Sequence, residues 1–228
     1  MGLYVIGDLH LSLSSSKPMD VFNGWENYVD RIKANWLENI KSNDVAVLAG
    51  DLSWGMSLEE SLEDFKFVNA LPGKKILLKG NHDYWWNTKK KMEDFFEANG
   101  LDTLNILHNN HYQYGEYGIC GTRGWINETD EPSDAKILAR EAARLEVSIQ
   151  SAEKAGLKPI VFLHYPPIYA GNYNYNILEV LFKHNIKQCF YGHIHGKSSA
   201  YAINDERDGI KFTLISGDFL QFKPFKIF

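Results

Sequence analysis

The chain has 228 residues, of which 44% are hydrophobic, and it carries a formal net charge of −5 at pH 7. This length suits one large α/β domain with a sizeable core, and the acidic balance argues against a broad nucleic-acid-binding surface. The only two cysteines, Cys120 and Cys189, stand alone in apolar runs, which excludes a disulfide framework or a cysteine-rich zinc site. No apolar run approaches the length of a membrane span, and a core-like run begins at Leu3 without a charged leader. We therefore expect a cytoplasmic protein that has no membrane partner.

Five short apolar runs predict buried β-strands, because each is bounded by turn residues and is too short for a helix. In chain order they are residues 3–6, 45–48, 76–78, 160–163 and 189–191. Each run ends at a polar cluster, and the clusters are Asp8-Leu9-His10, Gly50-Asp51, Gly80-Asn81-His82-Asp83, His164 and Gly192-His193-Ile194-His195. Ligands gather at the carboxyl ends of parallel strands, so we expect the five clusters to meet at one site.

Amphipathic segments between these strands predict helices. Residues 25–41 show the i, i+3, i+4, i+7 spacing of apolar side chains, and Ser57 with Glu60 forms a capping box for a helix that reaches about Asn69. Further helices are expected at 87–97, 133–154 and 176–184. Residues 111–120 read as a hairpin around Gly115, and residues 200–203 are expected to pair with 210–215 across a turn containing Asp208-Gly209.

The order and spacing of the five clusters resemble the calcineurin-like metallophosphoesterase superfamily. Five of the eight histidines fall inside the clusters, whereas His108, His111 and His184 lack such context and are expected to be surface or core residues. The resemblance is to the small bacterial-type phosphohydrolases of the superfamily. It implies a four-layer αββα sandwich with two mixed β-sheets, formed by a single catalytic domain over residues 1–228.

The resemblance also implies a centre of two divalent metal ions. Asp8, His10, Asp51 and His195 would hold the first ion, and Asp51, Asn81, His164 and His193 the second, so that the Asp51 carboxylate bridges them. Oxygen ligands mixed with imidazoles favour Mn²⁺, Fe²⁺ or Zn²⁺. Two such ions clamp a phosphoryl group and generate the hydroxide that attacks it.

His82 is the residue that the family uses against the leaving group, and we assign it as the general acid. Support of the metal ligands is the alternative role for this imidazole. Asp83, in the same cluster, is expected to tie down the loop rather than to take part in the chemistry.

One departure from the family pattern concerns substrate recognition. In the protein Ser/Thr phosphatases of the superfamily the second cluster continues as G-D-x-x-D-R-G, whereas residues 50–55 here read GDLSWG. Trp54 replaces the Asp that orients the catalytic His, and the phosphate-binding Arg is missing, which argues against phosphoprotein phosphatase activity. Arg123, in a Gly-flanked loop after a strand, is our candidate for binding the substrate phosphate, with a solvated surface arginine as the alternative.

These observations favour a phosphohydrolase of small phosphate esters, with phosphodiesters slightly preferred over phosphomonoesters. One alternative is a nuclease, but the chain is acidic and lacks the DNA-binding domain of the repair nucleases in the superfamily. Another alternative is a non-catalytic scaffold with the same fold. His82 and the complete ligand set argue against a scaffold.

Overall fold

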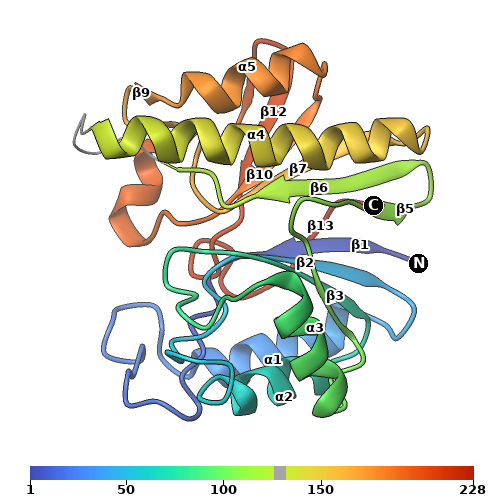
Figure 1. The fold of residues 1–228 in the computed structure, drawn as a ribbon. Coiled ribbons are helices and arrows are strands. Elements are labelled where there is room, and N and C mark those ends of the chain that lie inside the picture. Colours follow the sequence, from blue (N-terminus) through green and yellow to red (C-terminus); the bar gives the residue numbers. More distant parts are fainter. Residues whose placement is uncertain (126–131) are drawn as a thin grey trace.

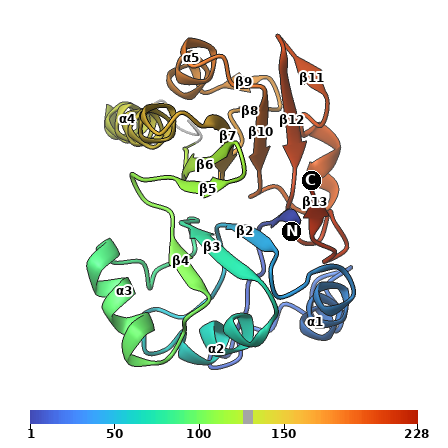
Figure 2. The ribbon, with the colours of Figure 1, turned by 90° about the vertical axis from the view of Figure 1, so that its right-hand side faces the viewer.

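Two β-sheets lie face to face in the computed structural model, and helices cover the outer face of each sheet (Figure 1). The structure describes residues 1–125 and 132–228. Seen from the side, the four layers follow one another as helices, sheet, sheet and helices (Figure 2). This is the αββα sandwich of mixed sheets that the sequence predicts.

The first sheet has the strand order β13-β1-β2-β3-β4. Its strands are β1 (Leu3–Ile6), β2 (Val45–Ala49), β3 (Lys74–Leu78), β4 (Leu104–Ile106) and β13 (Phe225–Lys226). All pairs are parallel except β13 with β1. The helices on its outer face are α1 (Tyr28–Asn39), α2 (Leu62–Ala70) and α3 (Lys89–Ala98).

The second sheet has the order β11-β12-β10-β7-β6-β5. Its strands are β5 (Tyr112–Tyr114), β6 (Tyr117–Thr122), β7 (Lys158–Leu163), β10 (Gln188–Tyr191), β11 (Glu206–Arg207) and β12 (Ile210–Leu214). The four central strands are parallel, and both edge strands are antiparallel to their neighbours. Helices α4 (Pro132–Lys154) and α5 (Tyr175–Lys183) cover its outer face, and β8 (Ile168–Tyr169) and β9 (Asn172–Tyr173) form a separate hairpin.

The central strands are buried on both faces, which explains why they read as unbroken apolar runs. In β1, Val5 belongs to the core between the two sheets, whereas Tyr4 and Ile6 pack in the core under α1–α3. In β2, Val47 faces the other sheet and Leu48 faces the helices. A third apolar core fills the space between the second sheet and helices α4 and α5.

Most of the predicted elements are present, but the prediction that residues 200–203 pair with residues 210–215 is wrong. Residues 196–201 form a 3-10 helix, and β11 rather than residues 200–203 pairs with β12. Asp208 and Gly209 have φ values of 51° and 77°, the left-handed conformations of a two-residue hairpin loop. Such a loop fixes the register, so the residues directly before it must form the partner strand.

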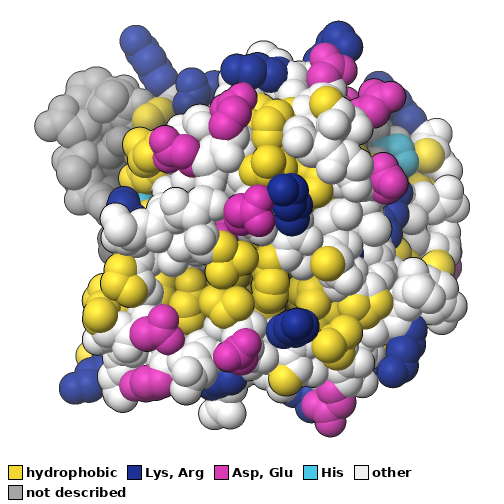
Figure 3. Space-filling model, turned by 90° about the horizontal axis from the view of Figure 1, so that it is seen from below, with side chains coloured by type: hydrophobic (Ala, Val, Ile, Leu, Met, Phe, Trp, Pro, Cys, Tyr) yellow, Lys and Arg dark blue, Asp and Glu magenta, His cyan; other side chains and the backbone are white. Residues whose placement is uncertain are grey.

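Helices α1 and α2 also begin later than the sequence predicts, and so does α3, which starts at Lys89 rather than at residue 87. Helix α1 starts at Tyr28, and α2 starts at Leu62. Ser57 Oγ accepts from the Glu60 amide at 3.2 Å as in a capping box, whereas the Glu60 carboxylate accepts from the Met56 amide at 2.9 Å. Ser57 and Glu60 thus stabilise a turn that precedes α2. No helix within residues 1–125 and 132–228 is long and apolar enough to cross a membrane. The face seen from below carries hydrophobic side chains in its middle, with charges of both signs around them (Figure 3).

Candidate metal centre

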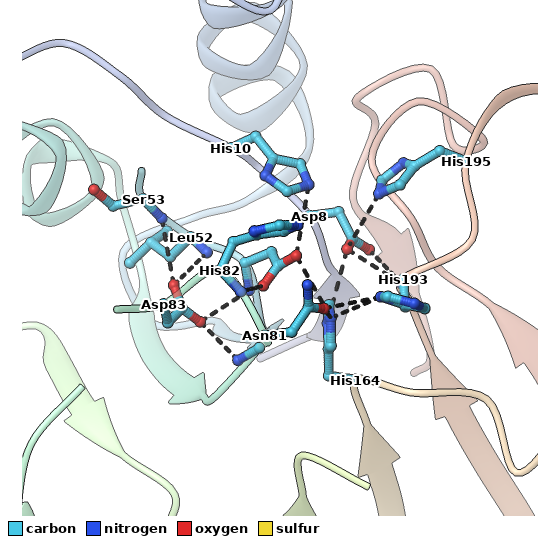
Figure 4. Close-up of polar contacts among 12 residues, drawn as sticks. Asp8, His10, Leu52, Ser53, Asn81, His82, Asp83, His164, His193 and His195 are labelled. Atoms are coloured by element: carbon cyan, nitrogen blue, oxygen red, sulfur yellow. Dashed lines mark hydrogen bonds and ion pairs between the residues drawn. The ribbon is translucent and has the colours of Figure 1, made fainter. Parts of the chain in front are cut away.

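The predicted ligands follow the carboxyl ends of β1, β2, β3, β7 and β10, and the fold brings these five strand ends together (Figure 4). The two sheets are joined at this end, because the Gly7 amide donates to Ile215 O at 2.8 Å, directly after β1 and β12. Ligand side chains from both sheets therefore converge on one region.

The backbone at the site is held in conformations that L residues rarely adopt. Asp8, His10, Asp51 and His193 have φ values of 58°, 45°, 51° and 72°. Each such residue costs on the order of 1 kcal/mol or more, and strain of this kind persists only where the surrounding structure enforces it. Four strained residues, all among the predicted ligands, mark this region as a functional site.

Two motif glycines are required by the close approach of neighbouring loops. A Cβ atom at Gly80 would overlap Oδ1 and the backbone nitrogen of Asp51, and a Cβ atom at Gly192 would overlap Oδ2 of Asp8. Any larger residue at either position would displace a predicted metal ligand.

The first donor group consists of Asp8, His10 and His195, which each offer a ligand atom within 4.8 Å of the others. Asp8 Oδ1 lies 3.5 Å from His195 Nε2. Asp8 and His10 are buried, whereas the His195 side chain is about one-third exposed, at 32%. These three residues are three of the four ligands that the sequence predicts for the first metal site.

The second donor group consists of Asp51, His164 and His193, again with ligand atoms within 4.8 Å of one another. The amide oxygen Oδ1 of Asn81 lies 2.6 Å from His164 Nε2 and 2.9 Å from His193 Nδ1 (Figure 4). One carboxylate, one amide oxygen and two imidazoles therefore point at a common position.

Asp51 lies between the two groups. Its Oδ2 atom is 3.7 Å from His10 Nε2 in the first group and 3.5 Å from His164 Nε2 in the second. Its Oδ1 atom accepts a hydrogen bond of 2.7 Å from the His82 backbone amide. One oxygen thus faces both donor groups while the other fixes the loop that carries Asn81.

The buried carboxylates of the site require nearby positive charge. Burial raises the pKa of Asp51 to about 8, and the nearby Asp8 carboxylate adds to this effect. Burial also disfavours the charged form of Asp8, but His195 outweighs it and holds the pKa of Asp8 below its usual range. Burial alone would lower the pKa of His195, but the Asp8 and Asp218 carboxylates raise it to about 10. Two adjacent buried carboxylates are costly without cations, so the donor set fits two divalent metal ions.

Asp83 ties two motif loops together, as expected. It is fully buried, and its carboxylate accepts hydrogen bonds from the backbone amides of Asp51 at 2.9 Å, Leu52 at 2.9 Å and Gly80 at 2.7 Å, and from Trp85 Nε1 at 2.9 Å. Among the described residues, the Asp83 carboxylate thus bonds to groups that hold the loops in place.

His82 lies beside the donor groups with its ring half-buried. Its ring centroid is 4.3 Å from that of Trp54, and its Nδ1 atom is 3.4 Å from the Tyr84 hydroxyl. Trp54, which replaces the orienting Asp of the phosphoprotein phosphatases, therefore packs directly against the His82 ring. Positioning of His82 here uses aromatic contacts in place of a carboxylate.

Sequence reasoning missed Asp218, which supports His195. Asp218 Oδ1 lies 2.8 Å from His195 Nδ1, and Oδ2 accepts a hydrogen bond of 2.8 Å from the Gly196 amide. The signal was present in the sequence, because Ser216-Gly217-Asp218 follows an apolar strand just as the other clusters do. This cluster contains no histidine and belongs to no motif of the family pattern, so Asp218 was not identified as a site residue.

The structure places Arg123 at a second cavity, away from the one that the metal-ligand residues line. Its Nη2 atom lies 3.7 Å from Glu141 Oε1, and its guanidinium carbon lies 4.7 Å from the ring centroid of Trp125. Of the histidines outside the clusters, His108 lines this second cavity, while His111 contacts Ser151 and His184 contacts Glu153.

The αββα sandwich and the two donor groups at its strand ends define a metallophosphoesterase. The sequence profile described as calcineurin-like phosphoesterase matches residues 1–197, so the chain belongs to the calcineurin-like phosphoesterase family and is a metal-dependent phosphoester hydrolase. The matched range contains all seven predicted ligands and His82, but not Asp218.

Solved structures share this fold at low sequence identity. A protein of unknown function from Aquifex aeolicus is 18% identical with a TM-score of 0.53, covering 99% of this chain and 95% of the other. The phosphopantetheinyl hydrolase of Mycobacterium tuberculosis is 13% identical with a TM-score of 0.56, at the same coverage of 99% and 95%. No curated protein matches the chain significantly.

Proposed function

We propose that this chain hydrolyses phosphate esters of small substrates at a centre of two divalent metal ions, Mn, Fe or Zn. The observation that carries the proposal is the position of Asp51, whose Oδ2 lies 3.7 Å from a histidine of one donor group and 3.5 Å from a histidine of the other. Asp8, His10 and His195 complete the first site, and Asn81, His164 and His193 complete the second. When bound, the metals supply Lewis acidity and activate the attacking water.

His82 acts as the general acid in this proposal. It lines the same cavity as His10, Asp51, His193 and His195, so its imidazole faces the space where the phosphoryl group binds. The imidazole donates a proton to the departing oxygen of the ester, which makes a poor leaving group easier to expel. Contacts with Trp54 and Tyr84 support the required ring orientation.

The shape and charge of this cavity support a small, weakly charged substrate. It has a volume of about 430 Å³, and Met19, Phe22, Trp25 and Trp54 form its apolar wall. Among the described residues that line it, none is Lys or Arg. A phosphodiester carries one negative charge where a monoester carries up to two, so this lining supports the preference for diesters.

The two cysteines support a cytoplasmic location. Cys120 and Cys189 are both buried and unpaired, and burial raises the pKa of the Cys120 thiol to about 12. Free thiols are typical of a reducing compartment.

The proposal is tested by loading the protein with Mn²⁺ and comparing kcat/KM for bis(p-nitrophenyl) phosphate and p-nitrophenyl phosphate. We expect hydrolysis of both esters, with the diester preferred. The Asp51→Asn variant is the control for contaminating activity. A protein that binds two ions yet hydrolyses neither ester would contradict the catalytic proposal, and a clear monoester preference would contradict the diester assignment.

The number of metal ions is tested separately by anomalous scattering from crystals grown with Mn²⁺. Two peaks less than about 5 Å apart are expected, one at each donor group. A single peak, or peaks elsewhere, would show that the centre is not dinuclear.

A further inference from the structure

A second cavity lies at the same end of the sandwich, and its chemistry differs from that of the metal centre. It has a volume of about 330 Å³ and is bounded by the ends of β3, β4 and β6 and by one face of α4. None of the seven predicted metal ligands lines it, and neither does His82. The two cavities share no lining residue.

The lining of this second cavity is positively charged. Among the described residues that line it, Lys79, Arg123 and Arg144 contribute three cations, and Glu141 contributes one carboxylate. The surplus of two positive charges stands out in a chain whose net charge is −5. Both Lys79 and Arg123 are largely shielded from solvent, and burial lowers the pKa of each. Cations gathered in a partly enclosed space attract an anion strongly.

Glu141 positions the two arginines but does not use up their hydrogen-bonding capacity. It is fully buried, with Oε2 accepting from Thr122 Oγ1 at 2.6 Å and Oε1 accepting from Arg144 Nη1 at 2.7 Å. Arg123 Nη2 stands further off, at 3.7 Å from the same Oε1. Each guanidinium carries five N–H donors, so most of them remain for a ligand.

Two of the cationic groups have donors that the described residues leave unpaired. Arg123 Nε is buried and has no hydrogen-bond partner in residues 1–125 and 132–228. Over the same residues, no hydrogen bond or ion pair involves the Lys79 ammonium group. Buried polar groups are normally satisfied, so the unpaired Arg123 Nε beside the cavity indicates a ligand that accepts hydrogen bonds, and the partly exposed Lys79 ammonium is free to bind the same ligand.

We propose that this cavity binds the phosphate group of a small phosphorylated molecule, independently of the metal centre. A phosphate dianion matches the surplus of two positive charges, and its oxygens accept from guanidinium groups in pairs. The volume allows a small organic group in addition to the phosphate. Trp86 and His108, with ring centroids 6.1 Å apart, provide an aromatic wall for that group.

The test is a titration of metal-free protein with inorganic phosphate, followed through the backbone amide signals in NMR spectra. The amides of Gly121, Thr122 and His108 should shift together and saturate with one Kd. Lys79→Gln should raise this Kd about ten- to hundredfold, the loss expected for one charge-assisted hydrogen bond to an anion. Because Lys79 makes no ion pair with Glu141, this variant leaves the buried carboxylate network intact.

Two arginine variants complete the test. Arg144→Gln should weaken phosphate binding to a similar extent, with folding checked by thermal unfolding. Arg140→Gln is the matched control, because Arg140 belongs to the same helix and lies 3.9 Å from Glu141 but does not line the cavity. Its Kd should equal that of the wild type.

Three outcomes would overturn the proposal. The first is the absence of any shift at tens of millimolar phosphate. The second is a set of shifts confined to amides of the metal centre, such as those of Asp8 and Gly192, which would place the anion there. The third is an equal rise in the Kd for phosphate in Arg140→Gln and Lys79→Gln, which would show that surface charge in general attracts the anion.

Discussion

Asp218→Asn should weaken the first metal site selectively. The Asp218 carboxylate holds His195 Nδ1 at 2.8 Å and the Gly196 amide at 2.8 Å, while the opposite ring nitrogen, Nε2, faces Asp8 at 3.5 Å. Asparagine has one carbonyl oxygen and therefore keeps only one of these two contacts. It also removes the negative charge that helps to raise the pKa of His195, and so makes the imidazole a poorer metal ligand.

The expected size of this effect follows from the kind of contact that is lost. A hydrogen bond to a charged group contributes about 1.5–3 kcal/mol, and loss of a partner behind a metal-binding histidine typically lowers metal affinity 10- to 100-fold. Asp218 and His195 are both partly exposed, at 10% and 32%, so solvent replaces some of the lost interaction. We therefore expect a loss nearer to about tenfold, or roughly 1.4 kcal/mol, at the first site. Among the described residues, the Asp218 carboxylate contacts His195 and the Gly196 amide, and it makes no hydrogen bond or ion pair with Asp51, His164 or His193 of the second site.

Calorimetric titration with Mn²⁺ resolves the two affinities if the sites differ in strength, and metal analysis after dialysis gives the occupancy that remains. Asp205→Asn is the matched control, because Asp205 is an exposed aspartate that pairs with Arg207 at 3.0 Å. Wild-type affinity at both sites in Asp218→Asn would refute the positioning role. Equal weakening at both sites would refute its selectivity for the first.

Three further predictions concern catalysis, metal bridging and stability. His82→Ala should lower kcat by about 10²–10⁴-fold for esters with poor leaving groups and by less for p-nitrophenolate, with metal content unchanged; equal losses across leaving groups would count against the acid role. Asp51→Asn should deplete both metals, whereas Asn81→Ala should affect only the second, as metal analysis of the two variants will decide. Lys75→Met should lower the free energy of unfolding by roughly 3 kcal/mol, because the fully buried Lys75 ammonium donates to backbone carbonyls in the last turn of α2 and directly after it. Urea unfolding measures this, with the exposed Lys74→Met expected to remain within about 0.5 kcal/mol of the wild type.

The sequence predicts the central strands well because a strand that is buried on both faces appears as an unbroken apolar run. Val5 and Val47 face the other sheet while their neighbours face the helices, so no polar residue interrupts either run. The polar clusters that follow are equally visible, since ligands must stand where buried strands end. Fold class and the positions of the predicted ligands thus come from the same local pattern.

Features that depend on tertiary contacts were harder to predict. The partner of β12 was misplaced because a two-residue loop, not the apolar content of residues 200–203, fixes the pairing. Asp218 was missed because its role exists only through His195, which stands 23 residues away in sequence. The environment of Arg123 depends on Glu141 of α4, and no spacing of residues in the sequence predicts that contact.

The donor groups also show why the ligands are spread over so much of the chain. Each group combines residues from both sheets: Asp8 and His10 follow β1 while His195 follows β10, and Asp51 follows β2 while His164 follows β7. Neither sheet with its own helices contains a complete group. In our proposal, metal binding therefore links the two halves of the sandwich at one end, and the buried carboxylates and strained backbone become favourable only once both sheets are in place. A centre built in this way requires motifs before and after the crossover from one sheet to the other, which is the order in which the sequence presents them.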